Sequence, residues 1–269
     1  MCNKLYKHEM LSYLRKWLPI EIIILCVALL GRFVQFFEAD TTAYDVIFGI
    51  TMFFYGTAII VSFVITFVVC IKRFHNNLFT GEGYLTFTLP VTPVQHILIK
   101  ACAAVTVMLS TIIIAVLSVF VLTAGEVAVE IFKAAAYLFK EFFEACNAHS
   151  VLYIAEYLVL LILSLFSGML LIYACIALGQ TFNKNRIGWA VAIYFIYYFI
   201  GRIITTVLTT VLSVNYDSIP FEKIARFIEK NTFGSVHIFF GVNIIFTFIG
   251  CAIFYLITHF IIKKKLNLE

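Results

Sequence analysis

Six long apolar stretches constrain the fold of this chain more than any other feature of its sequence. They cover residues 18–37, 46–71, 98–124, 151–180, 188–213 and 238–262. A helix needs roughly 20 apolar residues to cross the hydrocarbon core of a bilayer, which is about 30 Å thick. Hydrophobic residues make up 63% of the chain and charged residues only 13%, which excludes an ordinary soluble domain. The sequence therefore predicts an all-α membrane protein with six transmembrane helices, forming a single transmembrane domain over residues 1–269.

The basic residues between the apolar stretches indicate how the helices are oriented. The N-terminal segment, the gaps after the second and fourth stretches, and the C-terminal tail carry a net positive charge, whereas the other gaps are acidic or neutral. Short loops rich in Lys and Arg remain on the cytoplasmic side of a membrane. We therefore expect both termini to be cytoplasmic and residues 125–150 and 214–237 to be extracellular segments. Three basic residues between 223 and 230 are the weakest point of this assignment.

Residues 1–17 have the pattern of an amphipathic helix. One face carries apolar and aromatic side chains at helical spacing, namely Tyr6, Met10, Tyr13, Leu14 and Trp17. Basic side chains lie off that face, so the segment is expected to be an interfacial helix with its bases near anionic headgroups. A solvated basic tail leading into the first span is the alternative.

The sequence carries no recognisable catalytic or metal-binding motif. Its six His are scattered without ligand spacing, its seven Cys form no C-x-x-C pair, and neither a G-x-S-x-G elbow nor a phosphate-binding loop is present. We therefore predict no catalytic residue, no metal site, no cofactor and no nucleic-acid partner. An enzyme is not supported.

The gap at residues 72–97 has an unusual composition for a short loop. Glycines flank Glu82, and apolar residues at positions 85, 87 and 89 then alternate with threonines. Pro90 and Pro93 interrupt any regular helix. An exposed apolar segment of this kind docks either on a partner or against the chain's own helix ends.

Two runs in this gap resemble a known loop. Gly81-Glu82-Gly83-Tyr84-Leu85 and Thr88-Leu89-Pro90-Val91-Thr92-Pro93, followed by Lys100, are similar to the loop between the second and third spans of ABC-2 type transporter permeases. The typical sequence of that loop is Glu-x-Gly-Thr-Leu-Glu, then Leu-Leu-x-x-Pro-Val and then Gly-Lys. The motif in this chain resembles the variant found in small permeases of Gram-positive bacteria. The chain departs from the common form because Glu82 and Gly83 are adjacent, Tyr84 replaces Thr and Ile99 replaces Gly.

The resemblance implies a type-2 ABC exporter-like fold and a function. Residues 72–97 would be the cytoplasmic coupling loop that seats on a separate ABC ATP-binding subunit dimer, and the residues implied in docking are Glu82, Gly83, Tyr84, Leu85, Phe87, Leu89 and Pro90. Tyr84, Leu85 and Phe87 would form the apolar seat, while Glu82 would contact the ATPase or the amphipathic start. Mg-ATP would belong to the partner, and a second permease, identical or related, would complete the path. The chain would lie in the bacterial plasma membrane, in contact with membrane lipid.

Ionisable residues within or near the ends of the apolar stretches include Glu21, Arg32, Glu156 and Arg202. Glu21 and Arg32 lie near the ends of the first stretch, where snorkelling toward the headgroups is expected. Glu156 and Arg202 lie deeper and are candidate functional charges, because a charge at mid-depth costs at least about 2.5 kcal/mol unless it pairs or faces a polar cavity. Arg202 either pairs with Glu156 or contacts the transported cargo.

Two further segments allow more than one structure. The family resemblance suggests that Gly201 breaks the fifth span and that a re-entrant hairpin follows over residues 201–230, although a continuous span fits as well. Residues 126–146 have an amphipathic pattern that suits a helix either lying on the outer leaflet or capping the exit of the pathway.

The leading hypothesis is therefore the permease subunit of an ATP-driven exporter for an amphipathic or hydrophobic cargo, such as a peptide, an antimicrobial or a lipid-like compound. The alternative is a non-transporting immunity or sensor protein that sequesters a ligand. The loop favours the first, because an immunity protein has no need for an ATPase-docking segment. A secondary transporter is less well supported, since no acidic residue lies at the middle of a span.

Overall fold

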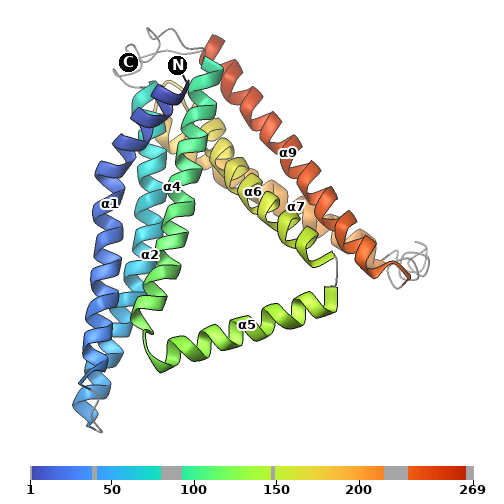
Figure 1. Ribbon diagram of the computed structural model, residues 1–269. Coiled ribbons are helices and arrows are strands. Elements are labelled where there is room, and N and C mark those ends of the chain that lie inside the picture. Colours follow the sequence, from blue (N-terminus) through green and yellow to red (C-terminus); the bar gives the residue numbers. More distant parts are fainter. Residues whose placement is uncertain (1, 38–40, 80–92, 147–148, 215–229, 265–269) are drawn as a thin grey trace. The chain divides into compact units, whose positions relative to one another are not determined.

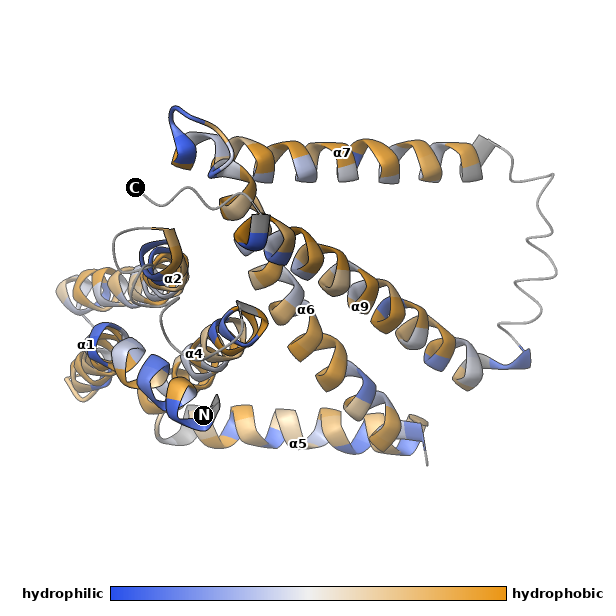
Figure 2. Ribbon diagram, turned by 90° about the horizontal axis from the view of Figure 1, so that it is seen from above, coloured by the Kyte–Doolittle hydropathy of each residue, from blue (hydrophilic) through white to orange (hydrophobic). Residues whose placement is uncertain are grey.

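The structure is a computed structural model that describes residues 2–37, 41–79, 93–146, 149–214 and 230–264. The described residues form seven helices (Figure 1). These are α1 (Cys2–Gln35), α2 (Thr42–Phe79), α4 (Pro93–Leu122), α5 (Glu126–Cys146), α6 (Ser150–Gly179), α7 (Arg186–Val214) and α9 (Thr232–Lys264). All except α5 are long and apolar enough to cross a membrane, and Figure 2 shows their predominantly hydrophobic colouring. The all-helical architecture and the six apolar spans predicted from the sequence are thus confirmed.

Each spanning helix overlaps one of the predicted apolar stretches and extends beyond it at one end or at both. Helix α2 is the longest, with 38 residues where the apolar stretch covers 46–71. At 1.5 Å per residue α2 is about 57 Å long, nearly twice the thickness of a hydrocarbon core. Helix α2 is therefore longer than one crossing requires, and Arg73 lies beyond its predicted apolar stretch.

The described helices fall into two compact units. The first contains α1, α2, α4 and most of α5, and the second contains α6, α7 and α9. In the first unit α1 packs along α4, and a small apolar core of Ile24, Ala28, Tyr55 and Leu122 joins α1, α2 and α4. The hydroxyl groups of Tyr55 and Ser118 are 2.8 Å apart and link α2 to α4 within this core.

Helix α1 is one helix where the sequence suggested an interfacial segment followed by a span. It continues through Pro19, whose ring removes one backbone hydrogen bond, and Figure 1 shows α1 bending in its N-terminal part. The predicted apolar face is the packed face: Tyr13 and Trp17 are buried, whereas Lys4 and Lys7 are exposed. Tyr6 on the same face lies within hydrogen-bond distance of Thr106 of α4, at 2.9 Å. This face therefore contacts protein rather than only lipid.

In the second unit α6 packs against both α7 and α9. Its C-terminal half is buried from Met169 to Ala177, and it ends at Gly179. A Cβ atom at Gly179 would lie 2.6 Å from the carbonyl oxygen of Arg186 and 2.9 Å from the backbone nitrogen of Ala190. The absence of a side chain at this position therefore allows the start of α7 to approach α6 closely.

Helix α7 is continuous through Gly201. It covers Arg186–Val214 with no break, so the first limb of the suggested re-entrant hairpin is instead the C-terminal part of one long helix. The suggested second limb begins at Pro220, and its residues up to position 229 lie outside the described residues.

Candidate functional site

The predicted ATPase-docking residues lie between α2 and α4, outside the described residues. These residues are Glu82, Gly83, Tyr84, Leu85, Phe87, Leu89 and Pro90. The docking role therefore stays a prediction. The structure describes α2, which precedes this loop, and α4, which follows it. It also describes the side chains that connect these two helices.

A buried ion-pair cluster joins these two helices to α1. Arg73, near the end of α2, donates from its Nε to Oε2 of Glu9 at 2.6 Å. Lys100, near the start of α4, donates from its Nζ to Oε1 of Glu9 at 2.5 Å. Each oxygen of one α1 carboxylate thus binds a cation from a different helix. We call Glu9, Arg73, Lys100 and Tyr13 the Glu9 cluster.

The cluster is shielded from solvent. Glu9 is 5% exposed and Lys100 is 2% exposed, although both carry charged groups. The guanidinium carbon of Arg73 lies 5.0 Å from the centre of the Tyr13 ring, a cation–π contact on the buried face of α1. His96, one turn before Lys100 on α4, is also buried.

Such a cluster couples its helices strongly. Charge-assisted hydrogen bonds are stronger than neutral ones, and removing one member of a buried ion pair costs about 3–5 kcal/mol because a charge is left without compensation. Separation of α1 from the ends of α2 or α4 is therefore unfavourable. The three helices are held together at the membrane side where the 80–92 loop begins and ends.

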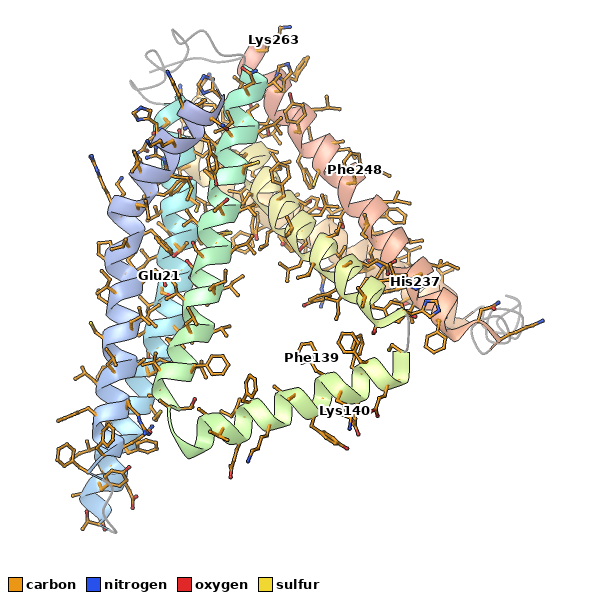
Figure 3. All side chains as sticks on the ribbon, in the orientation of Figure 1. Glu21, Phe139, Lys140, His237, Phe248 and Lys263 are labelled. Carbon is orange, nitrogen blue, oxygen red and sulfur yellow. The ribbon has the colours of Figure 1, made fainter. Side chains whose placement is uncertain are left out.

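A second polar network lies farther along α1. Trp17 donates from Nε1 to the hydroxyl of Thr111 at 2.8 Å, and that hydroxyl lies 2.9 Å from Oε1 of Glu21. The hydroxyl of Thr66 on α2 is 3.3 Å from the same Thr111 oxygen. Glu21 is 2% exposed, so the expectation that it snorkels is wrong: it is bound between helices instead (Figure 3). Arg32, by contrast, donates to Gln35 at 2.8 Å near the other end of α1.

Glu156 in the second unit has a histidine partner. Its Oε1 lies 2.8 Å from Nδ1 of His237 on α9, and Nε2 of His237 lies 3.0 Å from Nδ1 of His149. Tyr153 packs its ring against His237, with centroids 4.5 Å apart, and donates its hydroxyl hydrogen to the carbonyl of Phe233. This Glu156 cluster, defined by Glu156, His237, His149 and Tyr153, ties the start of α6 to α9.

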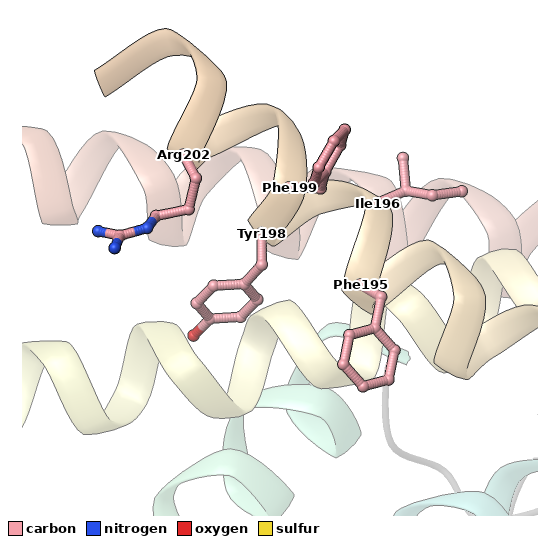
Figure 4. A pocket seen from close by; sticks show the side chains of 5 residues that line it. All are labelled: Phe195, Ile196, Tyr198, Phe199 and Arg202. Atoms are coloured by element: carbon pink, nitrogen blue, oxygen red, sulfur yellow. The ribbon is translucent and has the colours of Figure 1, made fainter. Parts of the chain in front are cut away.

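Arg202 does not form the ion pair that the sequence suggested. Its side chain is exposed on α7, and among the described residues no carboxylate lies within salt-bridge distance of it. It lines an open hollow of about 450 Å³ together with Phe195, Ile196, Tyr198 and Phe199. Figure 4 shows that Arg202 and Tyr198 point to the same side of α7. Arg202 remains available for a ligand or a neighbouring protein.

The comparisons with known proteins identify no relative. No family model matches the chain, and no curated protein or solved structure is similar to it. The fold itself therefore defines the class, which is a multi-pass helical membrane protein.

The two clusters were not recognised from the sequence. Glu9 is separated from Arg73 by 64 positions and from Lys100 by 91, and Glu156 from His237 by 81, so no local spacing connects them. One signal was available: Glu9 lies on the apolar face of the N-terminal helix, one turn before Tyr13, where a charged side chain needs a partner. The histidines gave no comparable signal.

Proposed function

We propose that the chain is the transmembrane permease subunit of an ATP-driven ABC exporter. The fold would be of the type-2 exporter kind, placed in the bacterial plasma membrane with both termini in the cytoplasm. The cargo would be amphipathic or hydrophobic and would leave the cell by alternating access. Two lines support this proposal: the resemblance of residues 81–100 to the coupling loop of such permeases, and the Glu9 cluster.

The observation that carries the proposal is the position of the Glu9 cluster. A loop that transmits force from an ATPase needs both of its ends attached to the helices that must move. Arg73 precedes the loop, Lys100 follows it, and Glu9 binds both. Displacement of the loop by an ATPase would then move α1, α2 and α4 together rather than only the loop.

The partners follow from this scheme. The nucleotide and its magnesium ion would be bound by an ABC ATPase dimer, and a second permease would complete the pathway. In a bilayer, Arg202 would be costly if it faced acyl chains, by about 2.5–3.5 kcal/mol or more. A neighbouring permease or the cargo itself would cover the hollow that Arg202 lines.

Co-expression with a candidate ATPase tests the proposal. We expect the ATPase to co-purify with the permease in mild detergent, and we expect ATP to change the protease sensitivity or the fluorescence of the permease in the complex. If the purified chain retains no ATPase and no nucleotide changes its conformation, the exporter assignment is wrong.

Fusion reporters test the orientation separately. Alkaline phosphatase, which is active only outside the cytoplasm, should be active when inserted in residues 125–150 and inactive when fused after residue 264. A fluorescent protein fused at the C terminus should be bright. The reverse pattern would place the 80–92 loop outside the cell and would contradict docking by a cytoplasmic ATPase.

A further inference from the structure

Helix α5 segregates its charged and apolar side chains. At 3.6 residues per turn, all five charged side chains between positions 130 and 144 fall within an arc of about 100°. These are Glu130, Lys133, Lys140, Glu141 and Glu144. The opposite side carries Ile131, Ala135, Leu138, Phe139 and Phe142. Figure 3 shows neighbouring Phe139 and Lys140 pointing to opposite sides of the helix.

The apolar side of α5 is uncovered. Every residue from Val129 to Glu141 is exposed, and Leu138 and Phe139 are 64% and 59% exposed. Figure 2 shows hydrophobic residues along the length of α5, between the charged ones. A continuous apolar surface of this length is not left in water, and the other helices of the first unit do not cover it.

The connections of α5 indicate what covers it. Helix α4 ends at Leu122 and α6 begins at Ser150, so segments 123–125 and 147–149 join α5 to the spans. Three residues reach at most about 10 Å. Because α4 and α6 are candidate spans and α5 is not, α4 and α6 would cross a membrane in opposite directions, and both ends of α5 would be tethered near the same membrane surface. Over about 30 Å of length, the helix must therefore lie along that surface.

The neighbouring surfaces are also apolar and exposed. Leu117 and Phe120 in the last turns of α4, and Val151 and Leu152 in the first turn of α6, are 43–63% exposed. These side chains belong to spans and contact lipid in a bilayer. The apolar side of α5 therefore lies, along the chain, between two span ends that are themselves apolar and exposed.

We propose that α5 is an interfacial helix that lies in the lipid headgroup region on the membrane face opposite the N terminus. Its apolar side contacts the upper acyl chains and its charged side faces water. Three of the five charges named above are acidic and two are basic, so attraction to anionic headgroups does not hold the helix in place. Its attachment depends on apolar contact and is the same with neutral and anionic phospholipids.

Fluorescence quenching by brominated lipids tests this placement in the full-length chain. The matched variants are Phe139→Trp and Lys140→Trp, which place an added indole on opposite sides of one helix turn. The parent, with its two native tryptophans, provides the signal to subtract. Each protein is reconstituted into phosphatidylcholine vesicles brominated either at shallow or at terminal acyl carbons, with and without phosphatidylglycerol.

The expected result is loss of most of the added signal at position 139 with shallow bromines, less loss with terminal bromines, and severalfold less loss at position 140. Phosphatidylglycerol should change none of these values. Equal quenching at the two positions, or none at position 139, overturns the proposal. Phe139→Cys provides a second test: rapid disulfide formation between two copies would show that another protomer, not lipid, covers this side. Neither test involves the ATPase, so their failure would leave the exporter proposal intact.

Discussion

Glu9 is the residue on which three helices of the first unit converge. Its two oxygens bind cations from α2 and α4 while its own backbone belongs to α1. A carboxylate that is 5% exposed is stable only because both oxygens have charged donors. The same geometry makes it the residue whose loss should most weaken the contact among α1, α2 and α4.

Replacing Glu9 by Gln should destabilise the purified permease. The change leaves Arg73 and Lys100 without their shared carboxylate, and we expect a loss of about 3–5 kcal/mol. Lys7→Gln is the matched control, because Lys7 is exposed on the same helix and should change stability by less than about 0.5 kcal/mol. Thermal unfolding, monitored by size-exclusion chromatography, measures the stability of both variants. Equal melting temperatures for the two variants would exclude a structural role for the cluster.

Glu156 should be coupled to His237 and not to Arg202. In a double-mutant cycle, Glu156→Gln and His237→Gln should be non-additive by about 0.5–3 kcal/mol, since the two side chains are in contact. Glu156→Gln and Arg202→Met should be additive within about 0.5 kcal/mol. Unfolding of each single and double variant gives the coupling energy. Coupling to Arg202 instead would restore the ion pair that the sequence suggested.

At the scale of elements, the sequence predicted the spans well and their interruptions poorly. Apolar composition is a local property, so the stretch at 151–180 matches α6 closely. A glycine such as Gly201 is ambiguous, because glycine permits a break without requiring one. Within a bilayer a break leaves backbone groups without partners, which favours the continuous α7.

The close approach of α6 and α7 at Gly179 gives a test at this scale. Gly179→Ala should destabilise the chain by about 1–3 kcal/mol, because the new methyl group would meet backbone atoms of α7. Gly168→Ala is the control on the same helix: its Cβ would meet nothing within 4 Å, and it should be neutral or stabilising by up to about 1 kcal/mol. Tolerance of alanine at position 179 would show that α6 and α7 do not pack as described.

At the scale of the whole molecule, the sequence predicted the class of protein but not its internal connections. Six spans follow from composition alone, and the asymmetry of basic residues predicts their orientation. The Glu9 cluster depends on three helices meeting, which no single segment encodes. The docking loop is the reverse case: its role was inferred from a motif, and the structure describes only the helices on either side.

The central claim is that the loop between α2 and α4 docks a separate ATPase. The most direct measurement is ATPase retention by a permease in which Tyr84, Leu85 and Phe87 are all replaced by Ser. The matched control replaces Tyr137, Leu138 and Phe139, the same residue types on α5, which is separated from the loop by the candidate span α4.

Both variants should remain inserted in the membrane, and retention is read by pull-down of the tagged permease. We predict that the loop variant loses the ATPase while the α5 variant retains it, because apolar anchors dominate an interface of this kind. Full ATPase retention and ATP-dependent conformational change in the loop variant would contradict the assignment.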